Sequence, residues 1–417
     1  MKKFGRMGAA ILALTAGTMA ADAAPQRNDK VFAAANAGRD GALALLKQIV
    51  NIDSGTGDVA GGARVASVMA EKFKALGGDV RVSPAEKTGF ADNLVAVFHG
   101  TGKGRILIVA HIDTVFGPGT AAKRPFTVTG DKAHGPGVQD CKAGVTATYA
   151  ALKILHDLNY RDYGTITVVL DGSEEPGSPG STRLIKTMAA QSDAEFNLEG
   201  GFEPDSLIVW RKGAANIHIA VTGREAHAGV APQNGRNAIT ELMHQLAAID
   251  NAFPHSGDGT TVNVTLIAGG ERTNIIPGHA EATLNVRYRK DADFAAVLAK
   301  VSRITAKPTV PDTTIAVSSD PAFPPMIASP VQDAMVARAK AIYGELGKSL
   351  GGIGSGGASE SALAVSVGTP ALDGLGYVGA DNHSDRETME LNSVVPRIYL
   401  LTRLLMDMGS APPLKAH

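Results

Sequence analysis

The sequence predicts an α/β protein in which a large domain with a mixed central sheet is interrupted by a smaller, inserted α+β domain of ferredoxin-like order. Patterns of buried strands and helices alternate in the first half of the chain, which is typical of a sheet covered by helices on both faces. A strand–helix–strand–strand–helix–strand pattern follows residue 212, and the mixed α/β pattern returns after residue 325. We therefore expect one domain from residues 24–212 and 326–417, and an inserted domain from residues 213–325.

The first residues have the features of a secretory signal peptide. Two lysines and an arginine precede the small apolar residues 9–21, and Ala21-Asp22-Ala23 offers a cleavage site. The apolar stretch is too short for a permanent membrane anchor, and no later segment has the pattern of a membrane span. We expect residues 1–23 to be removed and the mature protein to be secreted without a membrane anchor, into the periplasm where the cell has two membranes.

The elements of the large domain follow from apolar periodicity and from residues that end helices. The second predicted helix, for example, ends at Gly77 and Gly78. The run R-I-L-I-V-A at residues 105–110 suits a strand buried on both faces. The expected helices are 40–50, 60–76, 143–158, 331–343 and 391–408, and the expected strands are 93–98, 105–110, 165–170 and 370–377.

The strands of the inserted domain alternate apolar and polar residues, which predicts a sheet with one face open to water or to a partner. Residues 321–330 are expected to be a linker, and residues 351–357 to be a glycine-rich loop. The expected strands are centred on 217–221, 262–266, 282–286 and 313–317, and the expected helices are 235–250 and 291–304.

Composition argues against several classes of protein. The 417 residues carry 40 basic and 41 acidic side chains, a net charge of −1, so no basic excess points to nucleic acid. The single cysteine, Cys141, rules out an internal disulfide. Cys141 lacks the histidine signature of a catalytic thiol, which favours a small packed side chain. The glycine-rich segment lacks the Gly-Lys-Ser/Thr ending of a phosphate-binding loop.

Acidic and imidazole side chains stand at the ends of predicted strands or in the loops that follow them, in short segments rich in glycine and proline. Ligands of α/β proteins bind beyond the carboxyl ends of the strands, so residues far apart in sequence could converge there. Each one alone could be a surface residue, but imidazoles and carboxylates together are the ligands zinc takes where water must remain bound. These residues are His111, Asp113, Asp140, Glu174, Glu175, Glu199 and His383.

Four segments of the chain resemble the motifs of a known family. They are H-x-D-T-V, the segment around Asp140, E-E-x-G-S-x-G-S and the late His-Ser. Together they resemble the di-zinc metallopeptidases that include bacterial glutamate carboxypeptidase, aminoacylases and dipeptidases, over residues 31–409. The resemblance implies a zinc domain interrupted by a dimerisation or lid domain, two Zn²⁺ ions per chain, and a homodimer formed through the inserted domain.

The resemblance also implies a role for each metal ligand. Asp140 is expected to bridge the two ions. His111 and Glu199 complete one site, and Glu175 and His383 complete the other.

Further roles come with the same resemblance. Asp113 is expected to hydrogen-bond to His111 and fix its tautomer, and the peptide bond after Asp140 is expected to be cis. Glu174 is expected to be the general base. His227, in G-R-E-A-H-A-G-V-A-P, is expected to polarise the developing oxyanion, often from the partner subunit.

Asn274 and Arg287 match positions that hold the carboxylate of the substrate. A planar guanidinium binds a carboxylate through two hydrogen bonds, which suits Arg287 to that task. His227 and Arg287 could equally be plain surface residues when considered from the sequence alone.

The implied function is zinc-dependent hydrolysis of an amide bond, releasing a C-terminal amino acid from a small peptide or an N-acyl amino acid. Glutamate at position 199 is typical of the carboxypeptidase and aminoacylase side of the family. The alternatives are an N-acyl-amino-acid amidohydrolase and a non-catalytic periplasmic binding protein, which would have no use for a base at Glu174. Asp320 stands near positions where the resembling glutamate carboxypeptidase has arginines, so neutral or basic residues are expected to compete with glutamate for release.

Overall fold

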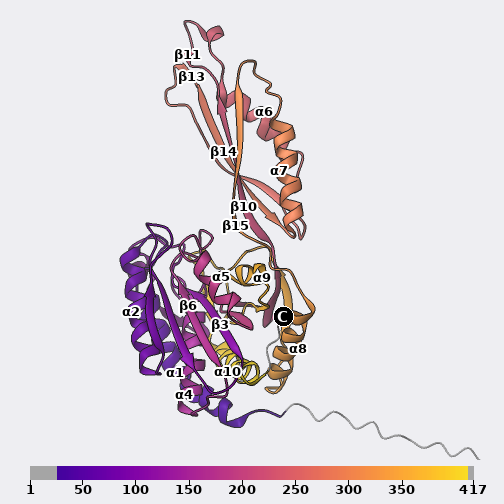
Figure 1. Cartoon of the computed structure of the whole chain (residues 1–417). Helices are drawn as coiled ribbons and strands as arrows, with labels where there is room; N and C mark the ends of the chain where they lie inside the picture. Colours follow the sequence, from indigo (N-terminus) through magenta and orange to yellow (C-terminus); the bar gives the residue numbers. More distant parts are fainter. Residues whose placement is uncertain (1–25, 412–417) are drawn as a thin grey trace, which may run out of the picture.

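The structure, a computed structural model, describes residues 26–411, so the predicted signal peptide of residues 1–23 lies outside the described residues. The chain forms a large lobe and an elongated small lobe (Figure 1). The small lobe is built from residues 213–323, and the two strands that lead into and out of it are neighbours. No helix within residues 26–411 has the length and apolar character needed to cross a membrane.

The central sheet of the large lobe has six strands in the order β1-β2-β6-β3-β7-β17. The pairs from β6 to β17 are parallel, whereas β1 and β2 add antiparallel pairs at one edge, so the sheet is mixed as predicted. The strands are β1 (Asp79–Ser83), β2 (Asn93–His99), β3 (Arg105–His111), β6 (Thr165–Asp171), β7 (Ala194–Asn197) and β17 (Ala371–Leu372).

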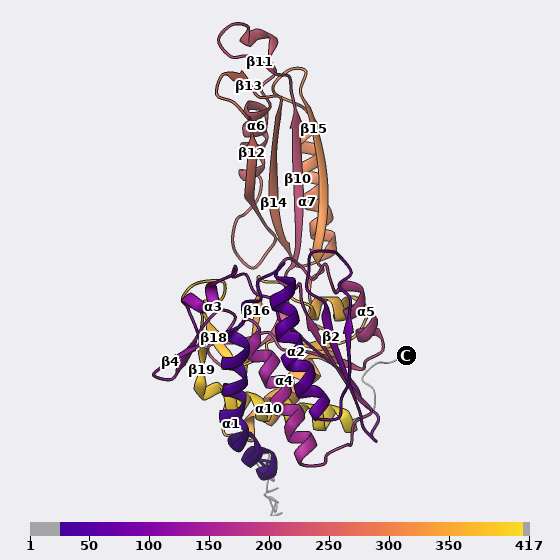
Figure 2. The same cartoon turned by 90° about the vertical axis from the view of Figure 1, so that its left-hand side faces the viewer.

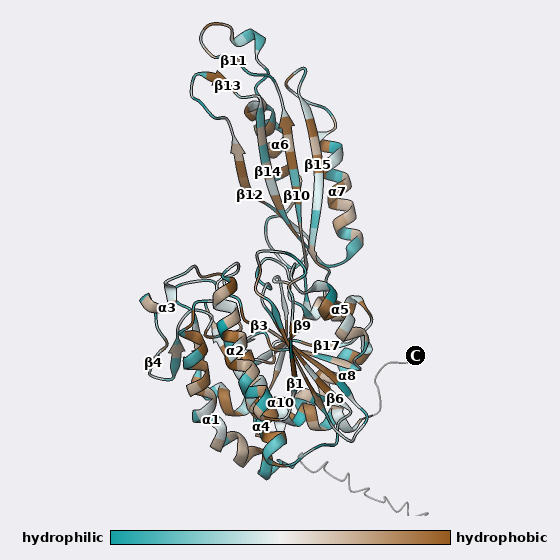
Figure 3. Cartoon of the chain, turned by 60° about the vertical axis from the view of Figure 1, so that its left-hand side comes forward, coloured by the Kyte–Doolittle hydropathy of each residue, from teal (hydrophilic) through white to brown (hydrophobic). Residues whose placement is uncertain are grey.

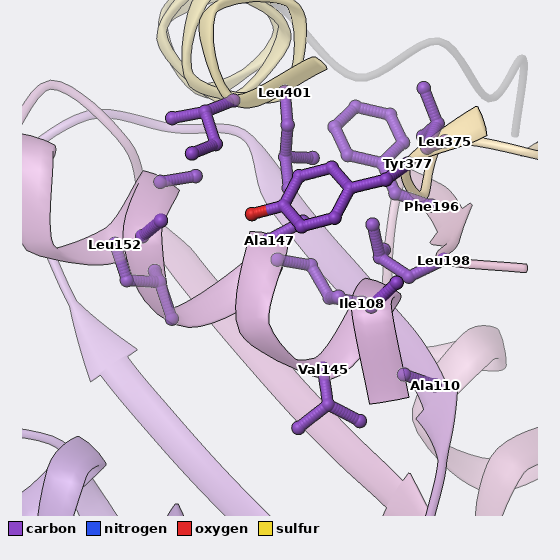
Figure 4. Packing of buried hydrophobic residues seen from close by; sticks show 14 of the residues in the cluster. Ile108, Ala110, Val145, Ala147, Leu152, Phe196, Leu198, Leu375, Tyr377 and Leu401 are labelled. Carbon is purple, nitrogen blue, oxygen red and sulfur yellow. The ribbon is translucent and has the colours of Figure 1, made fainter. Parts of the chain in front are cut away.

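Helices cover both faces of this sheet. Ile106 and Ile108 of β3 pack into a large core with α1, α4 and α10, whereas Leu107 and Val109 pack on the opposite face with α5 and α9. Figure 4 shows Tyr377 among the buried side chains of the larger core. The helices are α1 (Asp29–Val50), α2 (Val59–Ala75), α3 (Thr120–Lys123), α4 (Lys142–Asp157), α5 (Thr182–Ala190), α8 (Pro330–Gly344), α9 (Ser361–Ser366) and α10 (Val394–Ser410).

A second sheet of seven short strands, in the order β16-β9-β8-β18-β19-β5-β4, is not predicted by the sequence pattern. Its strand β16 (Gly351–Ser355) lies where a glycine-rich loop is expected. A Cβ atom on Gly354 would lie 1.8 Å from Trp210, so glycine lets β16 lie directly against β9. The other strands are β4 (Thr127–Thr129), β5 (Lys132–His134), β8 (Gly201–Phe202), β9 (Ser206–Arg211), β18 (Val378–Ala380) and β19 (Thr388–Glu390).

The small lobe is a four-stranded antiparallel sheet in the order β12-β14-β10-β15, with two helices against one face (Figure 2). Ile217 and Ile219 of β10 pack beneath the helices, whereas Asn216 and His218 lie on the open face. Hydrophobic residues mark β10 and β14 in Figure 3. The elements are β10 (Gly213–Thr222), α6 (Ala238–Asp250), β12 (Thr261–Gly269), β14 (His279–Tyr288), α7 (Asp291–Thr305) and β15 (Thr314–Phe323), which is the ferredoxin-like order.

Some predicted boundaries are wrong for identifiable reasons. Helix α1 begins at Asp29 rather than at residue 40, because the side chain of Asn28 accepts a hydrogen bond from the N–H of Val31 (3.2 Å) and caps the helix. Strand β15 continues through Pro321, which the sequence assigns to a linker. Proline is tolerated there because β15 is an edge strand.

Candidate metal centre

The predicted metal ligands meet at one edge of the central sheet. His111 is the last residue of β3, Glu175 follows β6, and Glu199 follows β7. These strands are parallel, so their carboxyl ends lie at the same edge. Asp140 precedes α4 and His383 follows β18, and both side chains reach the same place.

Asp140 links two groups of side chains. Its Oδ1 lies 3.1 Å from Nε2 of His111, which is also 3.3 Å from Oε1 of Glu199. Its Oδ2 lies 3.0 Å from Nε2 of His383, which is also 3.1 Å from Oε2 of Glu175. Each carboxylate oxygen of Asp140 therefore faces a different pair of one imidazole and one carboxylate.

These spacings fit two tetrahedral metal ions. Zinc lies about 2.0–2.1 Å from its nitrogen and oxygen ligands, which places neighbouring ligands of a tetrahedral site about 3.3 Å apart. Oε1 of Glu199 is buried and forms no hydrogen bond with any of residues 26–411, which suits an atom directed at a metal. Two imidazoles and three carboxylates are also the donor set that zinc takes where water remains bound.

Asp113 supports the site from behind His111. The carbonyl O and Oδ1 of Asp113 lie 3.0 and 3.3 Å from Nδ1 of His111, so Nδ1 carries the proton and Nε2 is left for a metal. The carboxylate of Asp113 also accepts hydrogen bonds from the backbone N–H groups of Glu174 (3.0 Å) and Glu175 (3.4 Å). Asp113 therefore fixes both the imidazole and the turn that carries the two glutamates.

Glu174 lies beside the ligands. One carboxylate oxygen each from Glu174, Glu199 and Glu360 lie within 4.8 Å of one another. Burial raises the pKa of the Glu174 carboxyl well above its usual value; His111 opposes this rise, and the nearby carboxylates of Glu360 and Glu199 add to it. A carboxylate whose pKa is raised binds a proton more strongly than an ordinary glutamate, which suits a general base.

Cys141 is a packed side chain next to the ligands. The Asp140–Cys141 peptide bond is cis, as the resemblance implies. Sγ of Cys141 donates a hydrogen bond to the carbonyl O of Leu198 (3.1 Å), and burial raises the pKa of the thiol well above its usual value. A buried, protonated thiol is a poor nucleophile, which agrees with a packing role.

Three predicted substrate-contacting residues are divided between the two ends of the small lobe. Arg287 lies near the large lobe, partly buried, where burial lowers its pKa and the charge of Glu174 opposes this. His227 lies at the far end in β11 (Ala226–His227), which pairs with β13 (Ile275–Ile276) beside Asn274 (Figures 1 and 2). The ten-residue strand β10 separates the two ends by about 30 Å. A single chain therefore does not bring His227 and Asn274 to its own metal ligands.

Two residues outside the predicted set of ligands hold the loop of Asp140. The carboxylate of Glu387 accepts hydrogen bonds of 2.9, 2.9 and 3.0 Å from three backbone N–H groups between Gly137 and Asp140. Nδ2 of Asn382 donates to Oδ2 of Asp140 (3.3 Å). Both flank His383 in a polar run that follows a strand, and this is the signal that could have found them.

A groove of about 740 Å³ opens beside Glu175. Val115, which is 44% exposed, and Phe116 form an apolar part of its wall. Two carboxyl groups line it, those of Asp58 and Glu175, and no basic side chain from residues 26–411 does. The groove therefore suits a group that is partly apolar and carries no negative charge, next to the candidate metal centre.

The chain matches a known protein family and resembles several known proteins in sequence. Residues 107–407 match the family described as Peptidase family M20/M25/M40. The chain is 34% identical over 405 residues to carboxypeptidase G2 of Pseudomonas sp. (strain RS-16), which covers 96% of this chain and 97% of that protein. It is 30% identical over 235 residues to a succinyl-diaminopimelate desuccinylase of Sphingopyxis alaskensis, which covers 52% of this chain and 60% of that protein.

Solved structures share the fold. The M20 family metallo-carboxypeptidase Sso-CP2 from Sulfolobus solfataricus matches with a TM-score of 0.71 and 17% identity, over 88% of this chain and 99% of that chain. Human carnosine dipeptidase 1 matches with a TM-score of 0.69 and 16% identity, over 92% of this chain and 100% of that chain. At these identities the similarity shows the fold alone.

Proposed function

Because the chain belongs to the peptidase family M20/M25/M40, and is thus a hydrolase of a metallopeptidase family, we propose that it is a carboxypeptidase with two zinc ions that releases a C-terminal amino acid from small peptides or N-acyl amino acids. One observation carries the proposal. Asp140 offers one oxygen to each of two imidazole–carboxylate pairs, and Glu174 stands beside them.

The five ligands would hold the ions in the arrangement implied by the resemblance, with Asp140 between them. His111 and Glu199 would complete one site, and Glu175 and His383 the other. Two such ions would polarise the scissile carbonyl and lower the pKa of a water molecule at the site.

Glu174 moves the proton in this proposal. It accepts a proton from the attacking water as the bond between the water oxygen and the carbonyl carbon forms. It then gives that proton to the leaving nitrogen as the carbon–nitrogen bond breaks. Asp113 holds the backbone of Glu174 and Glu175, so one carboxylate of the turn can face a metal while the other faces the water.

Arg287 supports release of a residue with a free carboxylate. It is partly buried, and its charge interacts with that of Glu174, so it lies on the side of the catalytic base. A guanidinium there can hold the α-carboxylate of the released residue through two hydrogen bonds. The relative that covers nearly the whole chain is also a carboxypeptidase by name.

An N-acyl-amino-acid amidohydrolase is the second candidate, and the groove beside Glu175 favours it. An apolar wall at Val115 and Phe116 suits an acyl group as well as a peptide side chain. The bond broken and the residues that break it are the same in both candidates. A non-catalytic binding protein is disfavoured, because it has no use for a base at Glu174 and the family is one of hydrolases.

We propose that the protein is a homodimer joined through its small lobes. β12 is an edge strand, and it exposes Leu266 (67%) and Ile267 (65%). An apolar edge of this kind favours pairing with another chain. A second copy would also supply His227 of β11 and Asn274, which precedes β13; both strands lie at the far end of the small lobe (Figure 1). His227 from that copy would donate to the oxyanion that develops in the transition state.

We further propose that the protein acts outside the cytoplasmic membrane. The support is the signal-peptide pattern of residues 1–23. Sequencing the amino terminus of protein recovered from the cell envelope should give a start near Ala24.

Metal content tests the proposed function. Purified protein should carry about two divalent ions per chain, lose activity to a chelator and regain it with zinc. Activity should be measured on a panel of N-acyl amino acids in which the released residue varies. A fully active preparation without metal would refute the mechanism.

A further inference from the structure

Arg211 is a buried side chain next to the metal centre that the proposed mechanism does not use. It ends strand β9 and is 4% exposed. Its Nε and Nη2 donate hydrogen bonds of 2.7 and 2.8 Å to the two carboxylate oxygens of Asp373. Its Nη2 also lies 3.8 Å from Oε2 of Glu199. The guanidinium therefore stands between a buried aspartate and a proposed metal ligand.

Asp373 holds the guanidinium in one place. It is fully buried, and its Oδ2 also accepts hydrogen bonds from the hydroxyl groups of Ser359 (2.6 Å) and Ser361 (2.5 Å). A buried ion pair is tolerated only where its polar atoms find partners, and here the fork of Arg211 and the two hydroxyls satisfy the carboxylate. The charge that faces Glu199 is thus fixed by the packing around Asp373.

We propose that Arg211 is a positioning residue for Glu199, an inference that rests on the proposed metal-dependent function. Oε1 of Glu199 faces Nε2 of His111, whereas Oε2 faces Arg211. Attraction between the guanidinium and Oε2 keeps Oε1 directed at the metal position and holds Oε2 away from it. Glu199 then contributes a single oxygen, which leaves a coordination position for water.

The main chain of Arg211 places this contact at the junction of the two lobes. The N–H of Arg211 donates to the carbonyl O of Met326 (3.2 Å), and the N–H of Met326 donates to the carbonyl O of Arg211 (3.1 Å). Arg211 lies just before β10 and Met326 just after β15, the strands that lead into and out of the small lobe. The same residue therefore contacts the junction of the lobes through its backbone and the proposed metal ligand through its side chain.

Arg211→Lys tests the proposal, because lysine keeps the charge but loses the planar fork. The single nitrogen of lysine lacks the fixed fork that binds both oxygens of Asp373 while it faces Glu199, so zinc affinity should fall about 10- to 100-fold. Competition with a chelator measures this without reference to activity. The visible spectrum of the Co²⁺-substituted protein should also change, because it reports ligand geometry. Arg211→Met is less informative, since removing a positive charge favours cation binding by itself.

Arg397→Lys is the matched control. Arg397 is also fully buried in the large lobe, and it donates hydrogen bonds of 2.9 and 2.6 Å to Asp205 rather than facing a proposed ligand. This control should lower the melting temperature but keep the zinc affinity and the Co²⁺ spectrum of the wild type.

The outcomes separate the inference from the proposed function. Wild-type zinc affinity and Co²⁺ spectrum in Arg211→Lys would overturn the positioning role, even if the melting temperature falls. If Arg211→Lys does not fold, Ser359→Ala removes one hydrogen bond to Asp373 and should weaken zinc binding by a smaller factor; unchanged binding there would also overturn it. Failure of the wild type to bind zinc at all would instead refute the proposed function.

Discussion

Two adjacent residues, Glu174 and Glu175, divide the proposed roles of base and ligand between them. Glu175 lies 3.1 Å from the imidazole of His383, whereas Glu174 lies with the carboxylates of Glu199 and Glu360. The division follows from the turn held by Asp113, which points consecutive side chains in different directions.

Glu174→Gln should therefore lower kcat by about 10²- to 10⁴-fold and leave the metal content unchanged, because it removes proton transfer but no ligand. Glu175→Gln should instead weaken metal binding. Steady-state kinetics and metal analysis of both variants check this. Equal loss of metal from the two would show that base and ligand have been assigned wrongly.

Glu195 of β7 is a second buried carboxyl with an unusual environment. Both of its carboxylate oxygens are buried without a hydrogen-bond partner in the described part of the chain. Burial raises the pKa of Glu195 well above its usual value, and the charges of Asp373 and Glu360 add to the rise. The folded protein therefore keeps this carboxyl protonated over a wide range of pH.

This predicts a pH-dependent effect of Glu195→Gln on stability. The unfolded chain ionises at the usual glutamate pKa of about 4.3, so the stability linked to Glu195 is complete below that pH. It is lost as pH rises toward the raised pKa of the folded state. Glutamine cannot ionise, so the melting temperature of the variant relative to wild type should increase from pH 5 to pH 8. A difference that stays constant with pH would contradict this account.

At the scale of elements, buried strands were the most predictable features. The predicted strands 93–98, 105–110 and 165–170 begin where the observed strands begin and end one residue early. They were predictable because continuous apolar runs mark strands that are buried on both faces. The second sheet escaped prediction, because strands as short as β8 have too few residues to show a period. β16 is rich in glycine, and it forms a strand by pairing with β9, a tertiary contact that the sequence pattern does not show.

The same distinction holds for the candidate site. The position of His111 could be predicted from the sequence, because it directly follows the predicted strand 105–110. The role of Glu199 came from the family resemblance, because no strand was predicted before it. Arg211 and Asp373 could not be paired, because 162 residues separate them and their contact depends on the tertiary fold. The distance of His227 from the metal ligands of its own chain could not be predicted either. The residues around His227 do not show how far the strands of the small lobe carry it from the large lobe.

The open face of the small sheet bears on substrate preference. Asp320 of β15 lies opposite Asn216 of β10, whose side chain accepts a hydrogen bond from Asn285 of β14 (3.1 Å). Nε of Arg287 donates to Oδ1 of Asn285 (2.9 Å). Asp320 thus lies on the same face as Arg287, about 12 Å away, two strand spacings across and two residues along the strand. Two cations at the entrance of the lobe already have partners, since Arg211 binds Asp373 and Lys212 donates to the carbonyl O of Gly257 (2.5 Å).

Asp320 should therefore disfavour substrates from which an acidic residue is released. For one acyl group, kcat/KM for alanine, phenylalanine and lysine should compete with kcat/KM for glutamate. Asp320→Asn should raise kcat/KM for glutamate several-fold and leave that for alanine nearly unchanged. A wild-type preference for glutamate above about 100-fold would show that another cation serves the substrate.

At the scale of the whole molecule, the two ends of the small lobe have different partners. Arg287 lies at the end of β14 that is nearest the large lobe of its own chain, whereas β11 and β13, which carry or adjoin His227 and Asn274, lie at the opposite end (Figure 1). Each active centre of the proposed homodimer would therefore draw residues from both chains.

Hybrid dimers test this arrangement. Glu174→Gln and His227→Ala chains should each be nearly inactive alone, with His227→Ala lowering kcat more than it raises KM. Mixed dimers contain one centre with both groups intact, so an equal mixture should regain about one quarter of wild-type activity. Mass spectrometry can verify that mixed dimers have formed. No recovery in verified mixed dimers would rule out action across the interface.

The attachment of the small lobe through neighbouring strands has a mechanical consequence. β10 and β15 pair side by side at the junction, with an irregularity in their register at Ala214 and Ala215, and a two-stranded ribbon bends more easily across its face than within its plane. The lobe is then a lever about 30 Å long, so a rotation of about 10° at the ribbon carries its tip through about 5 Å. In the proposed dimer each tip serves the opposite centre. A rotation that exposes one centre would therefore also move His227 away from the other centre. Opening of one centre of the proposed dimer is thus coupled to opening of the other.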